Sequence, residues 1–413
     1  MQPIRFVQFS LLCAGLAASP VTAFAQAADP QALRQEIDQL KADFETLRRQ
    51  YEDRLSALEA RAASLNVPVP AQPEAVPAQS VTLAAQSAAA GSSKVFNPDI
   101  SVLGNFAGAA GKNPLSEEPS LSLTEVEAAF QAVVDPYARA DFFLSAGPEG
   151  LEVEEGYATF TALPAGLLLK AGKMRAQFGK VNTLHTHVLP WVDRPLVLRS
   201  LLGGDEGIAD SGFSLSKLIP NRLMFIDAVG EVYRGGTDVF RGKTRSDLNY
   251  LGRIRGYRDL TEGTNLDVGA TYASGPSALV PDFDTQRIGF DATFRYRPLR
   301  RAIYRQFVGR TEVIWSRQAM PAGERQDASG LFASGDYQFA RRWFMGVRAD
   351  RSGRPLEADL HDSGGSIHLT FKPTEFSLIR GQYRRTNYAE GTNADEFLFQ
   401  INFAIGAHGA HPF

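Results

Sequence analysis

Two histidines that lie two positions apart are the residues best suited to bind a metal ion in this chain. His185 and His187 are followed about twenty residues later by Asp205 and Glu206. Imidazole and carboxylate groups together suit Zn²⁺ or a similar ion. Two loop histidines that bond only to backbone groups would have the same spacing, so the pattern leaves both interpretations open. His185 and His187 are therefore candidate zinc ligands.

No catalytic constellation is apparent in the rest of the sequence. A Gly-x-Ser-x-Gly nucleophile elbow and a His-Glu-x-x-His metal-protease motif are both absent from it. The composition, with 44% hydrophobic residues and a formal charge of -3, indicates no polyanionic partner such as nucleic acid. We expect neither an enzyme nor a resident cofactor.

The elements that would position these residues are predicted to be β-strands. Near the end of the chain Phe397, Phe399, Ile401, Phe403 and Ile405 share one face and alternate with more polar residues. The same period of two recurs over about 300 residues without a helix to cover the apolar face. No window reaches the roughly 18 continuous apolar residues of a membrane helix. The pattern predicts an all-β fold, a transmembrane antiparallel β-barrel.

Alternation and turn residues together predict about 16 strands. The predicted strands are 99–108, 121–134, 136–146, 151–161, 166–175, 211–217, 222–232, 247–258, 264–273, 285–298, 304–317, 327–340, 342–353, 362–373, 375–387 and 394–405. Tight turns are predicted at 135–136, 163–165, 219–221, 298–299 and 372–374. They alternate with longer polar loops, namely 109–120, 233–246, 274–284, 318–326, 354–361 and 388–393. This parity is typical of an outer-membrane barrel with short periplasmic turns and long external loops.

The alternation also predicts which side chains face the lipid and which face the lumen. In residues 287–297, apolar Ile288 and Phe290 alternate with Arg287 and Asp291. A polar inner face predicts a hydrated channel or a plugged lumen. Aromatic residues near predicted strand ends indicate a girdle at the membrane interface, formed by Tyr296, Trp315, Tyr337, Phe339 and Trp343.

Charge is distributed unevenly along the predicted barrel. Residues 99–160 contain eleven acidic and two basic residues, whereas residues 287–385 contain eighteen basic and ten acidic ones. Because strands adjacent in sequence are neighbours in such a barrel, we expect two walls of opposite sign and a transverse field between them. The alternative is that many of these charges lie in loops and neutralise one another.

Three segments precede the predicted barrel of residues 96–413. Residues 1–25 have a basic start, a short apolar run and a small-residue cleavage site, so they are predicted to be a signal peptide. Residues 26–65 carry apolar residues at heptad spacing and predict a periplasmic α-helical coiled coil, with a single amphipathic helix as the alternative. Residues 66–95 are rich in Pro, Ala and Ser and predict an extended linker.

One connection, residues 176–210, is much longer than the others. It contains too many apolar residues to extend into solvent, so we expect it to fold into the lumen and narrow it. The charged residues predicted to line this constriction are Arg175, Lys180, Arg194, Arg199, Asp205 and Glu206.

Two sets of residues resemble known outer-membrane families. Residues 170–180 (KAGKMRAQFGK) are similar to a strand of the phosphate-selective porins, whose layout of coil, linker and barrel this chain also resembles. Residues 96–100, 185–207 and 406–413 resemble short proteins labelled zinc-regulated or TonB-dependent receptors. The first resemblance implies a channel and the second implies uptake of a metal. Residues 26–94 are predicted to be coil and linker, not the plug domain that a gated receptor needs.

Three functions fit these observations. The first is an outer-membrane porin for passive or mildly selective diffusion of small hydrophilic solutes or ions. The second is an uptake receptor for zinc or a zinc chelate, with zinc as the bound or transported ion, and the third is a structural tether of the cell envelope. We expect a homotrimer in the lipid bilayer of a Gram-negative outer membrane. The solute stays open, because a one-residue shift of register would turn each lining side chain outward.

Overall fold

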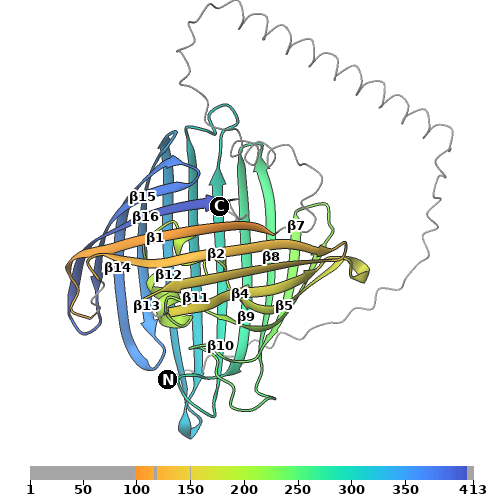
Figure 1. Ribbon diagram of the computed structural model, residues 1–413. Coiled ribbons are helices and arrows are strands. Elements are labelled where there is room, and N and C mark those ends of the chain that lie inside the picture. Colours follow the sequence, from red (N-terminus) through yellow and green to blue (C-terminus); the bar gives the residue numbers. More distant parts are fainter. Residues whose placement is uncertain (1–97, 116–118, 149, 407–413) are drawn as a thin grey trace, which may run out of the picture. The chain divides into compact units, whose positions relative to one another are not determined.

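The computed structural model describes residues 98–115, 119–148 and 150–406, so the signal peptide, coiled coil and linker predicted above lie outside the described residues. The described residues form one closed barrel of sixteen antiparallel strands (Figure 1). Strand β1 (Asp99–Lys112) pairs with β2 (Ser122–Asp135) on one side and with β16 (Asn393–Gly406) on the other, which closes the sheet. The predicted fold class and strand number of the barrel are confirmed.

The remaining strands follow one another around the barrel in sequence order. They are β3 (Ala138–Gly147), β4 (Gly150–Phe160), β5 (Leu167–Arg175), β6 (Ala209–Ile219), β7 (Phe225–Tyr233), β8 (Asn249–Thr261), β9 (Thr264–Pro276), β10 (Asp284–Tyr296), β11 (Gln306–Ala319), β12 (Arg325–Ala340), β13 (Trp343–Arg354), β14 (Glu357–Thr374) and β15 (Ser377–Asn387). We call the end where β1 begins and β16 ends the terminus rim, and the opposite end the loop rim.

The strict alternation of long and short connections is wrong at three places, and the first is the loop-rim connection of β3 to β4, which is only two residues long. A loop is predicted at 354–361, but β13 and β14 continue their ladder through Gly353–His361 and Arg354–Glu357 pairs, so that only two residues connect them. A tight turn is predicted at 298–299 on the terminus rim, but the connection there spans 297–305. Polar residues beyond the membrane can extend a strand pair, because backbone pairing does not require apolar side chains.

The two faces of the strands are as the alternation predicts. In β10, Arg287 and Asp291 are 1% and 4% exposed and face the lumen, whereas Phe290 is 52% exposed and faces outward. The same outward exposure of large apolar side chains recurs around the barrel, for example at Phe213, Leu215, Ile254, Tyr272, Val347, Ile367 and Phe397. A continuous apolar exterior around a polar interior is the arrangement of a barrel that spans a bilayer.

Four of the five aromatic residues predicted for the girdle lie near strand ends. Tyr296, Tyr337, Phe339 and Trp343 are partly exposed near the terminus rim, on β10, β12 and β13. Trp315 lies further inside β11, and its ring packs edge-on against Phe290 with 5.8 Å between the ring centroids. Among the residues that the structure describes, no helix is long and apolar enough to cross a membrane.

A pair of substitutions on the outer face of β10 tests the membrane position. Phe290 lies at the middle of the strand and Gln286 near its loop-rim end, on the same face. Phe290→Arg should lower the free energy of unfolding in lipid vesicles by roughly 2–4 kcal/mol, and Gln286→Arg by roughly 0–1 kcal/mol, because the cost of a charge depends on its depth. Equal costs in denaturant titrations would contradict the lipid-facing assignment.

Candidate functional site

Residues 176–208 connect β5 to β6 and run through the inside of the barrel. They contain the short 3-10 turn η2 (Thr186–Val188) and the helix α3 (Leu196–Leu201). Helix α3 packs against β11 to β14, which lie about half a circuit away from β5 in the strand order. The loop therefore crosses the lumen from one wall to the other.

The loop brings its own apolar core into a lumen that is otherwise polar. Phe178, Leu189, Trp191, Leu198 and Leu201 are at most 1% exposed. They pack with the buried wall residues Tyr233, Ile314 and Phe332 and with Phe240 of the connection between β7 and β8. Burying these side chains removes apolar surface from water, which stabilises the loop inside the barrel.

Polar side chains of the wall accept hydrogen bonds from the backbone of the loop. Glu312 Oε1 accepts from the backbone nitrogens of Lys180 and Val181, both at 2.8 Å. Gln177 donates to Glu231 at 2.9 Å and Leu196 to Asp350 at 3.2 Å. The wall thus supplies the hydrogen-bond partners that an irregular segment elsewhere finds in neighbouring strands or in water.

A glycine allows the closest of these approaches. Gly179 adopts a φ of 59° in the left-handed region, and a Cβ built on it would lie 2.4 Å from Glu312 Oε2. Only a residue without a side chain fits a positive φ and this contact together. The turn at Gly179 therefore directs the next two N–H groups to one carboxylate.

Asp193 fixes the far part of the loop to the opposite wall. Its Oδ2 accepts hydrogen bonds from Arg348 at 2.8 Å and from Arg384 at 2.9 Å. Burial by itself would raise the pKa of Asp193, but the two guanidinium groups hold it well below its ordinary value. Asp193 is therefore a carboxylate at neutral pH and links β13 to β15 through the loop.

The two histidines of the loop meet four glutamates of the barrel wall. His185 Nδ1 lies 2.6 Å from Glu127 Oε2, and His185 Nε2 lies 2.7 Å from Glu155 Oε1. His187 Nδ1 lies 3.2 Å from Glu125 Oε2. Burial disfavours a charged ring, yet the surrounding carboxylates hold the pKa of His185 well above its ordinary value.

These glutamates come from β2 and β4, not from the loop. Glu125 and Glu127 alternate with apolar residues on β2 and so face the lumen. On β4 a bulge opposite Phe143 and Leu144 leaves Glu154 unpaired, so that Glu154 and Glu155 are both buried. The acidic composition of residues 99–160 predicted an acidic wall. No sequence pattern predicted the bulge that turns both Glu154 and Glu155 inward.

Asp205 and Glu206, the carboxylates that the sequence suggests beside the histidines, have other partners. Asp205 pairs with Arg199 at 3.2 Å, and both side chains are partly exposed. Glu206 has one carboxylate oxygen 3.7 Å from Arg175, and its backbone oxygen accepts a hydrogen bond from Arg175 at 2.6 Å.

Two of the arginines predicted to line the constriction are buried. Arg175 is 3% exposed and forms an ion pair with Glu154. Arg194 is 1% exposed and donates to the backbone oxygen of Leu184 at 2.9 Å. Burial, together with repulsion from Arg175, lowers the pKa of Arg194 to about 10. In this structure both side chains therefore support the loop from within.

Lys180 belongs to a basic region that it forms with side chains of β8 to β10 and that stays partly open. It forms an ion pair with Asp267, whose carboxylate also lies 2.7 Å from Arg255 and 3.9 Å from Arg295. The side chains of Lys180, Arg255 and Arg295 are 26%, 37% and 32% exposed. Arg310, on the neighbouring strand β11, is 24% exposed and pairs with Asp336 at 2.5 Å. Three cations thus share one buried carboxylate.

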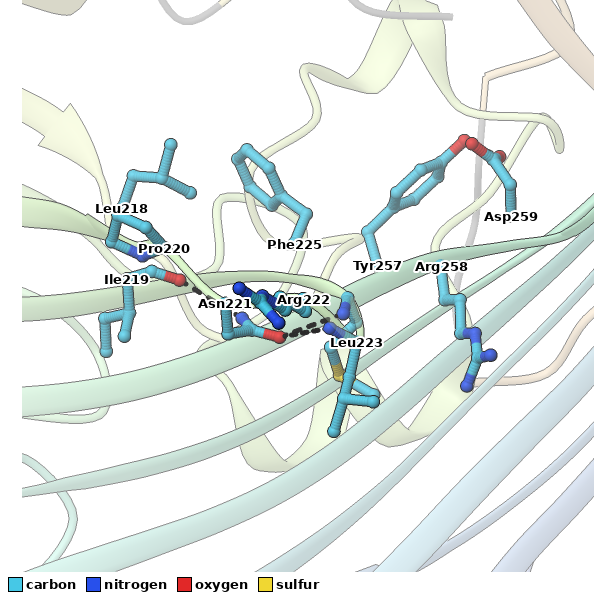
Figure 2. A pocket seen from close by; sticks show the side chains of 11 residues that line it. Leu218, Ile219, Pro220, Asn221, Arg222, Leu223, Phe225, Tyr257, Arg258 and Asp259 are labelled. Carbon is cyan, nitrogen blue, oxygen red and sulfur yellow. Dashed lines mark hydrogen bonds between the residues drawn. The ribbon is translucent and has the colours of Figure 1, made fainter. Parts of the chain in front are cut away.

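A separate hollow of about 540 Å³ lies at the terminus rim, where β6 turns into β7 beside the end of β8 (Figure 2). The side chain of Asn221 shapes this turn by accepting hydrogen bonds from the backbone nitrogens of Leu223 at 2.9 Å and Met224 at 3.0 Å. None of its lining residues belongs to the loop inside the barrel. The hollow is a feature of a tight turn and is distinct from the candidate site.

Comparison with known proteins places the fold. No family model matches the chain. The anion-selective porin from Comamonas acidovorans superposes with a TM-score of 0.53 at 11% identity, covering 75% of this chain and 100% of that chain. The outer-membrane channel DcaP of Acinetobacter baumannii gives a TM-score of 0.50 at 8% identity, with 75% and 96% covered. The chain has the porin fold.

A further solved structure and one protein sequence are also similar to this chain. A loop L8 deletion mutant of OmpT, an outer membrane protein of Vibrio cholerae, has a TM-score of 0.53 at 9% identity, with 75% of this chain and 99% of that chain covered. In sequence, an uncharacterized protein of Aquifex aeolicus (strain VF5) is 29% identical over 390 residues, which cover 78% of this chain and 81% of that protein. The solved structures share the porin fold with this chain at identities that leave its function to be argued from the site.

Removing the charge of Asp193 tests how firmly the loop is held. Asp193→Asn should lower the free energy of unfolding by about 1.5–3 kcal/mol, the range for hydrogen bonds to charged groups. The loss is limited because Arg348 and Arg384 keep Asp350 and Glu396 as partners. Asp205→Asn, an exposed control in the same loop, should change stability by less than about 0.5 kcal/mol. Equal effects in denaturant titrations would contradict the anchoring role.

Proposed function

We propose that this protein is an outer-membrane channel through which small hydrophilic solutes diffuse passively, with a preference for small anions. The observation that supports this proposal most is that the internal loop covers the acidic wall and the arginines Arg348, Arg380 and Arg384, whereas the basic side chains around Asp267 stay partly open. Two proteins with this fold, an anion-selective porin and an outer-membrane channel, are in keeping with it.

The exposed fractions of the charged side chains distinguish the two walls. On the acidic wall the side chains of Glu127, Glu154 and Glu155 are only 3%, 8% and 11% exposed, because the loop histidines lie against them. In the basic region around Asp267, Arg255 and Arg295 are 37% and 32% exposed. An ion in the remaining lumen would therefore meet mainly positive charge, and low-dielectric walls strengthen such a field.

Orientation and assembly follow from the porin fold in this proposal. The terminus rim would face the periplasm, because short turns of outer-membrane barrels lie on that side. A homotrimer in the lipid bilayer is the proposed assembly, in line with a solved trimer form of OmpT from Vibrio cholerae. The coiled coil expected to support the trimer lies outside the described residues. The alternative function as an envelope tether depends on the same coil and is not part of this proposal.

The alternative of a zinc uptake receptor is less well supported by the site. His185 and His187 are 3% and 2% exposed beneath the loop. A metal ion bound between them would be enclosed rather than placed on a path through the lumen. We therefore favour the channel, and catalysis forms no part of the proposal.

A double substitution on the basic wall tests the channel and its selectivity. Arg255→Ala with Arg295→Ala should shift the reversal potential of the purified protein in a planar bilayer toward cations, because two exposed positive charges leave the lumen. Arg258→Ala, on the opposite face of β8, is the matched control and should keep wild-type selectivity. A folded protein without conductance steps would contradict the channel, and unchanged selectivity in the double variant would contradict the anion preference.

The charge of Lys180 predicts a pH dependence of the same selectivity. Burial, with repulsion from Arg295 and Arg255, lowers the pKa of Lys180 to about 8 in spite of its contact with Asp267. The ammonium group is charged below this pKa and neutral above it, so anion preference should fall between about pH 7 and about pH 9. Lys180→Arg should keep the preference over that range. If reversal potentials of wild type and variant respond equally to pH, Lys180 does not face the permeating ions.

A further inference from the structure

The junction between the loop and the acidic wall contains a compact set of metal-ligand side chains. Ligand atoms of Glu127, His185 and His187 all lie within 4.8 Å of one another, as do those of Glu125, Glu127 and Glu154. Turn η2 brings the two imidazole rings together, with 5.7 Å between their centroids. Two imidazole nitrogens with carboxylate oxygens are typical ligands of zinc-like ions, whereas Mg²⁺ and Ca²⁺ prefer oxygen alone.

Three distances between donor atoms are close to the spacing of a tetrahedral site. Zinc–ligand bonds of about 2.0–2.1 Å place neighbouring ligand atoms about 3.3 Å apart. Glu127 lies 2.6 Å from His185 Nδ1 through Oε2 and 4.0 Å from His187 Nε2 through Oε1. Glu154 Oε2 lies 3.2 Å from His185 Nδ1. Each of these three distances is within about 1 Å of that spacing.

Glu154 provides a second indication that the site has a ligand. The residue is only 6% exposed, and within the part of the chain that the structure describes its Oε2 accepts no hydrogen bond. This oxygen lies 3.2 Å from His185 Nδ1, the nitrogen that also faces Glu127. A metal ion that displaces the proton from this nitrogen would take over the partnership with Glu154.

In each histidine, the outer ring nitrogen, which is the one directed away from Glu127, lies beside another carboxylate, as in zinc proteins. His185 Nε2 lies 2.7 Å from Glu155, and His187 Nδ1 lies 3.2 Å from Glu125. Metal-binding histidines generally direct their second nitrogen to a carboxylate, which fixes the ring and increases its basicity. Glu155 and Glu125 thus occupy the positions of outer partners, and the inner nitrogens face Glu127.

We propose that His185, His187, Glu127 and Glu154 bind one divalent ion of the zinc type, which fastens the loop to the acidic wall. Glu127 lies on β2, Glu154 on β4 and both histidines on the loop, so one ion would cross-link three segments. Because the site is enclosed, the ion is a structural component and not a transported solute. The proposal does not rest on the channel function, since ion binding is measured without conductance.

The test begins with the wild-type chain folded in detergent. Protein stripped with a chelator and then dialysed against Zn²⁺ should retain about one ion per chain and melt at a higher temperature, since a ligand that binds only the folded state stabilises it. X-ray absorption of the zinc-loaded protein should show at least two imidazole ligands and oxygen ligands at about 2.0–2.2 Å. Less than half an ion per chain, or a spectrum without imidazole, would overturn the proposal.

Variants then assign the ion to these residues. Loss of an outer partner typically weakens metal binding by about 10–100-fold. Because His187 is a direct ligand, His187→Gln should weaken Zn²⁺ binding by more than about 100-fold, and Glu127→Gln should also weaken it. His368→Gln is the matched control, because His368 is a buried lumenal histidine on β14 that bonds to Asp336 at 2.8 Å. It should bind zinc as the wild type does. If the control loses binding as His187→Gln does, the site is elsewhere, and if His187→Gln does not fold, the absorption spectrum of the wild type decides.

Discussion

The backbone of the internal loop must find hydrogen-bond partners inside the barrel, and the rest of the interior is arranged around this requirement. A buried N–H group without a partner costs about 1–3 kcal/mol. Glu312 and Asp350 accept from backbone nitrogens of the loop, and Gln382 accepts from Val192 at 2.9 Å. The wall therefore acts as a template for the loop, and its polar side chains have fixed positions.

The same packing decides which charges remain in contact with the lumen. His185 and Arg175 lie on the loop side of the acidic wall and bury its carboxylates. Apolar residues near Trp191 fill the space toward β12, where its ring packs against Phe332 with 5.3 Å between centroids. The basic side chains around Asp267 stay partly exposed. One arrangement of the loop thus determines both its own stability inside the barrel and the sign of the charge that lines the open lumen.

Most of the barrel could be predicted because a strand has a side-chain period of two. The parity of Arg287 and Phe290 places one in the lumen and the other toward lipid, and the structure agrees. Connection lengths were less predictable. Residues 355–356 form a two-residue link, because strand pairing extends into sequence that is polar and has no alternating pattern. Backbone hydrogen bonds determine where β13 and β14 end, and no side-chain pattern in the sequence reports these bonds.

The sequence by itself determined the strands, their faces, the acidic and basic segments and the presence of a long loop with His185 and His187. These features are local, since each depends on periodicity or composition within a few residues. Only the tertiary structure decided which carboxylates meet the histidines. Glu127 and Glu154 lie far from the loop in sequence and reach it because barrel closure and a bulge at Glu154 place them on the wall that the loop covers. Such a meeting depends on the folding of the loop across the lumen, which no local pattern specifies.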